Sequence, residues 1–191
     1  MKKILIFSLV LMTFFLLTAC AHYSLVEGGK TVVVGEGFRT TPQRAWSMGE
    51  EEGAIFWTAD GPGLQRLIFF PAVGDGKPLY GAMGDKAGTV PLFYATMTPL
   101  EIMDLVEATL VRRGVHQLEK QNLRPATMCN RDGFRFDFSF AAKSGLRYRG
   151  FATGTVKDRK LYLILYTGTE LHYYDLYLRE AESMAASTQI L

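Results

Sequence analysis

The side chains best suited to nucleophilic or metal chemistry are the two cysteines and three histidines of the chain. Their spacing matches no zinc-binding pattern, because no two histidines stand four residues apart and none lies beside a pair of cysteines. The chain also lacks the G-x-S-x-G and Walker motifs of hydrolases and nucleotide-binding proteins. Cys129, in ATMCNRDG, has no motif around it that supplies an activating base, so we expect an ordinary half-buried thiol. The sequence therefore predicts no metal site, no cofactor and no catalytic motif.

The first residues of the chain have the pattern of an export signal. Lys2 and Lys3 precede an uncharged stretch over residues 4–17, which is broken only by Ser8 and Thr13. A helix needs about 20 apolar residues to cross a bilayer. This stretch is shorter and has the length of a signal-peptide core.

The signal ends in Leu17-Thr18-Ala19-Cys20, which resembles the lipobox of bacterial lipoproteins: an aliphatic residue, two small residues and a cysteine. The resemblance implies that residues 1–19 are removed and that Cys20, as the new N-terminus, carries acyl chains. Two or more chains are needed because a single chain gives only marginal membrane binding. An ordinary signal peptide cut near a cysteine is the alternative. The same resemblance implies an outer-membrane location, on the periplasmic side, because Ala21 rather than Asp follows the cysteine.

The mature chain is expected to be electrically neutral. The sequence holds 21 basic and 19 acidic residues, and loss of residues 1–19 removes Lys2 and Lys3 but no acid. We exclude nucleic acid as a partner, because proteins that bind it carry a basic surface. With Cys20 acylated, Cys129 has no disulfide partner, so the fold must depend on its hydrophobic core. The length fits a single domain over residues 31–191, joined to the lipid by a polar tether over residues 20–30.

Two helices are predicted. In TPLEIMDLVEATLVRRG, Thr98 and Glu101 can form a capping box, Pro99 suits the first helical position, and Gly114 ends the helix. A second helix is predicted over about residues 173–187, where apolar side chains repeat at helical spacing. These side chains are Tyr174, Leu178, Ala181 and Ala185.

Between the helices, the period of the pattern changes to two, which is typical of strands. GFRFDFSF places four phenylalanines from Phe134 to Phe140 on one side, and the polar residues between them on the other. GLRYRGFATGTV and LYLILYTG continue this strand as an antiparallel meander. We expect Phe138 to face Tyr148 and Val156 to face Leu161. We also expect a helix to pack on the phenylalanine side, over a channel of small residues at 150, 152 and 154.

Upstream, TVVVG, AIFWTAD, LQRLIFFPAV and KPLYG are predicted strands separated by turns, and we interpret VHQLEKQNL as a strand. The whole pattern predicts an α+β domain with a mostly antiparallel, twisted sheet of about seven or eight strands and two main helices.

The meander GFRFDFSF…GLRYRGFATG…KLYLILYTG, followed by EAESMAAS, resembles the end of PsbP-like domains. These domains form an extrinsic photosystem II subunit and a nuclear-import factor that binds a small GTPase. The resemblance covers about residues 54–187 and implies a PsbP-like sandwich with a final helix packed on the sheet. The general character of the sequence is also similar to that of small proteobacterial lipoproteins with no assigned activity. The resemblance to PsbP-like domains implies a binding or assembly module without catalysis.

These observations predict a lipid-anchored protein of the cell envelope that binds another envelope protein. The candidate partner-binding residues are Arg147, Arg149, Tyr162 and Tyr166, on the sheet face opposite the phenylalanines, because Arg and Tyr are favoured at interfaces. The alternative for this half-apolar face is that another element covers it.

Two other functions remain open. A periplasmic hydrolase could act through dispersed residues such as His172, Asp175 and Asp137. A carrier of small apolar ligands could use the Phe/Leu side of the sheet as the lining of a cavity, which a helix packed tightly over residues 150–154 would exclude.

Overall fold

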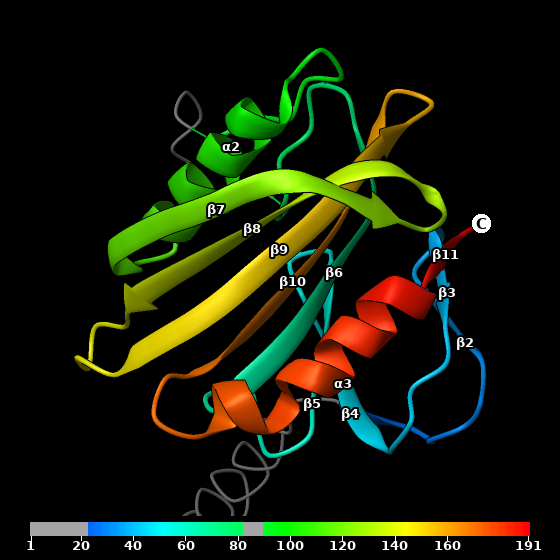
Figure 1. Ribbon diagram of the computed structural model, residues 1–191, viewed down its shortest axis with the longest axis vertical. Helices are drawn as coiled ribbons and strands as arrows, with labels where there is room; N and C mark the ends of the chain where they lie inside the picture. Colours follow the sequence, from blue (N-terminus) through cyan, green and yellow to red (C-terminus); the bar gives the residue numbers. More distant parts are fainter. Residues whose placement is uncertain (1–22, 82–89) are drawn as a thin grey trace, which may run out of the picture.

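The computed structural model describes residues 23–81 and 90–191, and it has the predicted α+β architecture. An antiparallel sheet of eight strands is flanked, in this part of the chain, by two helices, α2 (Pro99–Arg112) and α3 (Tyr173–Ser187) (Figure 1). In spatial order the strands are β1 (Ser24–Val26), β4 (Trp46–Glu51), β5 (Ala54–Thr58), β6 (Gln65–Gly74), β10 (Lys160–Thr169), β9 (Arg147–Lys157), β8 (Arg131–Ala141) and β7 (His116–Met128).

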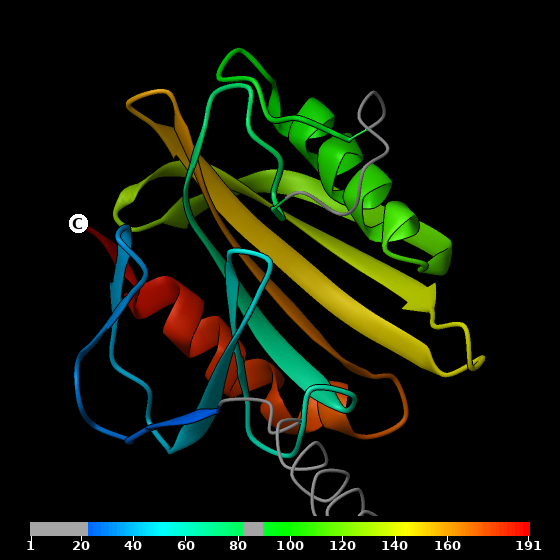
Figure 2. The same cartoon turned by 180° about the vertical axis from the view of Figure 1, so that it is seen from behind.

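A second, small sheet helps to cover one face of the large one. It consists of β2 (Val32–Val34), β3 (Phe38–Thr40) and β11 (Gln189–Ile190), in the order β11-β3-β2. This small sheet and α3 lie on one face of the large sheet, and α2 lies on the other (Figures 1 and 2). The large sheet therefore has a hydrophobic core on each side.

Helix α2 begins and ends where the sequence predicts. The Thr98 backbone N–H donates to Glu101 Oε2 at 2.7 Å, and the Glu101 backbone N–H donates to Thr98 Oγ1 at 3.3 Å, which completes the capping box. Gly114 follows the helix at φ +87°, a conformation that favours glycine. The buried side chains of α2 face the phenylalanine side of the sheet. They are Ile102, Met103, Leu105, Val106, Thr109 and Leu110.

Helix α3 also has the predicted bounds, and it packs on the opposite face of the sheet. Tyr174, Tyr177 and Ala181 are buried there, together with Met184 and Ala185. Polar contacts with the first half of the chain hold the helix in place. The Tyr177 hydroxyl donates to Asp60, and Trp46 Nε1 donates to Glu180 at 3.2 Å.

The turn between β9 and β10 has the predicted register. Val156 faces Leu161 across a two-residue turn made by Asp158 and Arg159, which have φ values of +50° and +60°. Residues further along these strands keep the same register, so that Ala152 faces Leu165.

The register between β8 and β9 differs from the prediction by two residues. Tyr148 faces Phe140 rather than Phe138, because residues 142–146 form a longer loop than the three-residue turn expected. Gly145, at φ +84°, closes this loop onto Ala142. A shift of two residues leaves every side chain on its original face, so the predicted sides of the sheet are correct.

The small residues of β9 accommodate side chains of the neighbouring strand rather than the helix. A Cβ atom at Gly150 would lie 2.5 Å from the Phe138 ring and 2.6 Å from the Tyr166 carbonyl oxygen. At Gly154 it would lie 2.8 Å from the Phe134 ring. The channel is therefore filled by the phenylalanines of β8, on which α2 then packs.

Three parts of the first half of the chain differ from the prediction. KPLYG is not a strand and contributes only an isolated bridge between Lys77 and Phe93. The strands β3 and β4 are additional to those predicted. The expected tether over residues 20–30 includes β1, which pairs Ser24 with Met48 and so joins the edge of the large sheet.

The other edge of the large sheet, β7, is irregular. Its register with β8 shifts between residues 116 and 119 and again between residues 121 and 124. Gln117 and Asn122 have positive φ values at these shifts, as expected for bulges, and Pro125 removes a backbone donor further along the strand.

The glycine at position 150 offers a test of this packing. We expect Gly150→Ala to lower the free energy of unfolding by about 1–3 kcal/mol, because the backbone oxygen of Tyr166 cannot move away cheaply. Gly63→Ala is the matched control, since a Cβ there meets no atom within 4 Å. It should stay within about 0.5 kcal/mol of the parent protein. Equilibrium urea unfolding measures both, and equal stabilities would contradict the packing described.

Candidate functional site

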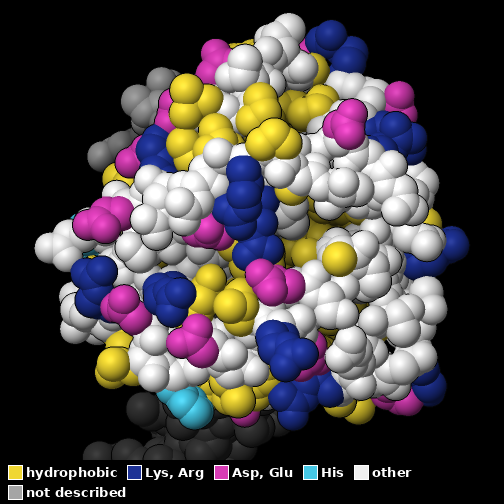
Figure 3. All heavy atoms as spheres, viewed as in Figure 1, with side chains coloured by type: hydrophobic (Ala, Val, Ile, Leu, Met, Phe, Trp, Pro, Cys, Tyr) yellow, Lys and Arg dark blue, Asp and Glu magenta, His cyan; other side chains and the backbone are white. Residues whose placement is uncertain are grey.

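Four arginines lie on one side of three neighbouring strands, next to α3. Arg124 comes from β7, Arg135 from β8, and Arg147 and Arg149 from β9; we refer to these four residues as the arginine face. Side chains alternate between the two faces along β8, so Arg135 and Ser139 point away from the side of the phenylalanines. Arg124 faces Arg135, and Arg149 faces Ser139. Residues that face each other on neighbouring strands point to the same side, so the arginines share the side opposite the phenylalanines. Basic and acidic side chains alternate over this part of the surface (Figure 3).

The half of the arginine face next to β7 is organised around one carboxylate. Asp137 accepts from Arg124 Nη1 at 3.1 Å, and Arg135 Nε lies 3.5 Å from its other oxygen. Arg135 also donates to Glu182 of α3 at 2.7 Å, and its guanidinium lies 4.1 Å from the centroid of the Phe151 ring. These contacts restrain Arg135, whose side chain is 20% exposed.

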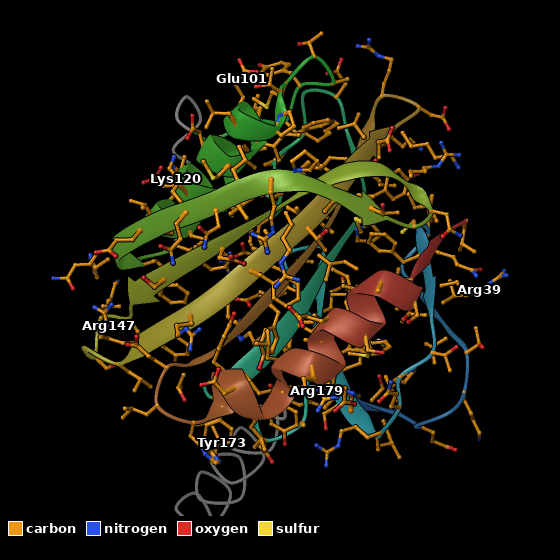
Figure 4. All side chains as sticks on the ribbon, in the orientation of Figure 1. Arg39, Glu101, Lys120, Arg147, Tyr173 and Arg179 are labelled. Atoms are coloured by element: carbon orange, nitrogen blue, oxygen red, sulfur yellow. The ribbon has the colours of Figure 1, made fainter. Side chains whose placement is uncertain are left out.

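The half nearer the start of α3 is more exposed. Arg149 Nη1 donates to Asp175 at 3.3 Å, and its guanidinium lies 4.2 Å from the centroid of the Tyr174 ring. Arg147 Nε donates to Glu170 at 2.8 Å, and its side chain is 47% exposed at the end of β9 (Figure 4). Two arginines are thus held in defined positions while much of their surface stays accessible.

Tyr162 and Tyr166 do not share this accessibility. Tyr162 is 6% exposed under the small sheet, where its ring makes an edge contact with Phe38. Tyr166 is fully buried under α3, and its hydroxyl lies 2.9 Å from both the Tyr173 and the Tyr174 carbonyl oxygens. The four residues predicted for partner binding therefore do not form one accessible surface, and the alternative that another element covers the face holds for the two tyrosines.

Arg124 and Arg135 extend the surface beyond the predicted residues. The alternation of GFRFDFSF had already placed Arg135 on this side. Arg124 could not be placed from the pattern, because the two register shifts in β7 interrupt its alternation.

The residues suggested for a hydrolase are separated. Asp137 is paired with Arg124 and Arg135, and Asp175 is paired with Arg149. His172 is exposed just before α3, and its ring contact is with Tyr173. No hydrogen bond joins the histidine to either carboxylate in the described part of the chain, so these three residues do not form a catalytic triad there.

The other candidates for chemistry give no site. Cys20 and His22 lie outside the described residues. Burial raises the pKa of Cys129 to about 11, so its thiol stays protonated at neutral pH and is a poor nucleophile. Within residues 23–81 and 90–191, no cluster of His, Cys, Asp and Glu could hold a metal ion. In the same residues, no helix is long and apolar enough to cross a bilayer.

The phenylalanine side of the sheet is packed. Phe134, Phe136, Phe138 and Phe140 are each at most 8% exposed beneath α2 and the loops beside it. A groove of about 300 Å³ lies at the end of this side, where Arg66 and Arg113 meet Glu51 and Tyr80. Both arginines pair with Glu51, and Arg113 also pairs with Glu52, so two carboxylates compensate the two arginines.

Tyr80 shows how strongly this region is buried. It is 5% exposed, and burial raises the pKa of its hydroxyl to about 12, although the Arg113 guanidinium 3.8 Å from its ring centroid opposes the shift.

Tyr166 and Arg149 should respond very differently to substitution. We expect Tyr166→Ala to lower the free energy of unfolding by roughly 3–5 kcal/mol, as for other buried aromatic side chains, and Tyr166→Phe by about 1 kcal/mol. Arg149→Ala should cost less than about 1 kcal/mol, because its ion pair is exposed. Thermal and urea unfolding measure these values. A similar loss in Tyr166→Ala and Arg149→Ala would contradict the burial described.

Tyr80 also predicts a pH dependence. Its pKa in the folded state is above the ordinary value of 10, so the unfolded state releases the proton first as the pH rises. The contribution of Tyr80 to the free energy of unfolding is therefore complete below pH 10. It is lost between about pH 10 and 12, which lowers the free energy of unfolding by roughly 2–3 kcal/mol. Urea unfolding across this range should show a smaller fall in Tyr80→Phe than in the parent protein. Identical pH profiles would disprove the assignment.

Comparison with known proteins identifies the fold but does not assign the chain to a family. No protein-family model matches the chain, and no curated protein matches it either. Among solved structures, the solution structure of cyanobacterial PsbP (CyanoP) from Synechocystis is similar over 91% of this chain and 95% of its own, with a TM-score of 0.54 and 14% identity. LpqN, described as involved in cell envelope biogenesis of Mycobacterium tuberculosis, matches over 88% of this chain and 90% of its own, with a TM-score of 0.38 and 9% identity. The likeness to CyanoP shows that the domain has a PsbP-like fold.

Proposed function

We propose that this protein is anchored to the bacterial cell envelope by acyl chains on Cys20 and binds another envelope protein there without catalysing a reaction. The arginine face is the single observation that carries the binding role. Ala21 favours the periplasmic side of the outer membrane as the location.

The anchor is supported by three features of the sequence that agree with one another. Lys2 and Lys3 begin the segment, the uncharged stretch over residues 4–17 has the length of a signal-peptide core, and Leu17 to Cys20 match a lipobox. Acyl chains on one residue provide stable attachment only when two or more are present, which is what lipobox processing supplies.

The binding role is supported by the way in which the arginines are held. Arg147 and Arg149 are already positioned by Glu170, Asp175 and the Tyr174 ring, so a partner would have to immobilise them less on binding. Arginine is also enriched among the residues that dominate binding energy at interfaces. Because each arginine has a carboxylate neighbour, we expect a partner with charges of both signs rather than a strongly acidic one.

The experiment is cross-linking of the lipidated protein in cells, followed by mass spectrometry of the captured partners. Arg147→Ala/Arg149→Ala should reduce capture of a dominant partner by ~10-fold or more, as expected for residues worth 1.4 kcal/mol or more. Arg39→Ala/Arg159→Ala is the matched control. It removes two exposed arginines that lie in β3 and in the turn between β9 and β10, away from the arginine face.

A Cys20→Ala variant exported by an ordinary signal peptide tests the anchor separately. It should leave the membrane fraction and lose capture of a membrane-bound partner. Equal capture by the arginine-face variant and its control would remove this surface as the binding site. Capture of no specific protein by any form would turn the interpretation toward a ligand-binding protein.

A further inference from the structure

The lipid anchor restricts how the domain can stand on the membrane. Two residues separate Cys20 from Tyr23, where the described chain begins, so the three steps between the two positions span at most about 11 Å when fully extended. A domain of this length has a radius of gyration of about 15 Å. The anchor is therefore shorter than the domain is wide, so the part of the domain near Tyr23 has to stay close to the lipid.

Tyr23 is fixed to the body of the domain. Its ring makes an edge contact with Phe56, with the centroids 6.1 Å apart, and the next residue, Ser24, pairs with Met48. The chain enters β1 near the lower end of the long axis, the end at which α3 begins and the β5–β6 turn lies (Figures 1 and 2). Tyr173, the first residue of α3, is labelled at that end in Figure 4, and Glu101 of α2 at the opposite end.

The same end presents apolar side chains to solvent. Leu171, between β10 and α3, is 95% exposed, and Leu176, in the first turns of α3, is 53% exposed. Tyr23 is 42% exposed. A single exposed leucine is ordinary in a soluble domain. Here Leu171 and Leu176 lie at the end to which the proposed lipid is attached.

The segment that carries Leu171 is held in place. The Glu170 backbone N–H donates to the Arg147 carbonyl oxygen at 3.0 Å, and the His172 backbone N–H donates to the Thr169 carbonyl oxygen at 3.4 Å. The two acidic residues next to these leucines in the sequence are compensated. Glu170 pairs with Arg147 and Asp175 with Arg149. An acidic side chain without such a partner would be repelled by an anionic lipid surface.

We propose that this end of the domain, with Leu171 and Leu176 as its apolar contacts and Tyr23 on the other side of the sheet, rests on the surface of the phospholipid bilayer. The proposal rests on the proposed acylation of Cys20. Tyrosine and leucine suit the boundary between headgroups and acyl chains. Arg147 then lies to the side of the contact, and the start of α2, marked by Glu101, points away from the membrane (Figure 4).

The test uses the acylated full-length chain reconstituted into vesicles of phosphatidylethanolamine and phosphatidylglycerol. In a Cys129→Ala background, Leu171→Cys carries an environment-sensitive fluorophore. Leu100→Cys is the matched control, because Leu100 is also an exposed leucine (53%) and lies next to Glu101 at the opposite end. Circular dichroism checks that each variant folds.

We expect the label at position 171 to show a blue-shifted emission on vesicles and to be quenched by brominated lipids, whereas the label at position 100 behaves as in buffer. If the protein floats with the vesicles but both labels stay in water, the orientation is wrong and the anchor stands. A label at position 171 that is shielded only when a second protein is added assigns this end to a protein partner instead and overturns the proposal. If the full-length chain isolated from membranes carries no acyl chains and does not float, the anchor fails and the orientation with it.

Discussion

The burial of β10 on both faces at once is the constraint on which the rest of the structure depends. Every residue from Leu161 to Thr169 is buried, and β6 and β9 pair with the strand on either side. Leu161, Leu163 and Leu165 enter the core beneath α2, while Tyr162, Ile164 and Tyr166 enter the core beneath α3. A strand of this kind requires a covering layer on each side, so both helices and the small sheet follow from it.

The sequence was sufficient for several features with a local signal, although not for the turn between β8 and β9 or for KPLYG. The capping box of Thr98 and Glu101, the helical repeat of α3 and the turn at Asp158 each involve residues close together in the chain, and the structure has all three where the pattern predicts them. The cover over Tyr162 and Tyr166 is different in kind. It is formed by α3, by strands of three residues, and by the pairing of Gln189 with Arg39, which no pattern within one segment can indicate.

The candidate site was predictable in the same partial way. Alternation along β8 and β9 identified the side of the sheet on which Arg149 lies, and the structure agrees. The arginines that stay accessible are those that α3 does not cover. The position of α3 on the sheet depends on packing between segments that are distant in the sequence. The ion pairs from α3 to Arg135 and Arg149 mark this boundary, since each joins a carboxylate of the helix to a strand that the helix only partly covers.

The irregular edge at β7 has a consequence for the membrane anchor that we propose. Copies anchored to one leaflet meet in two dimensions, and their sheets can approach edge to edge far more often than in free solution. An edge strand with open backbone donors and acceptors would then recruit its neighbours into a continuous sheet. The bulges near Gln117 and Asn122, together with Pro125, break the regular hydrogen-bonding edge that such growth would need. With the proposed anchor, the β7 edge would therefore not turn such encounters into a continuous sheet.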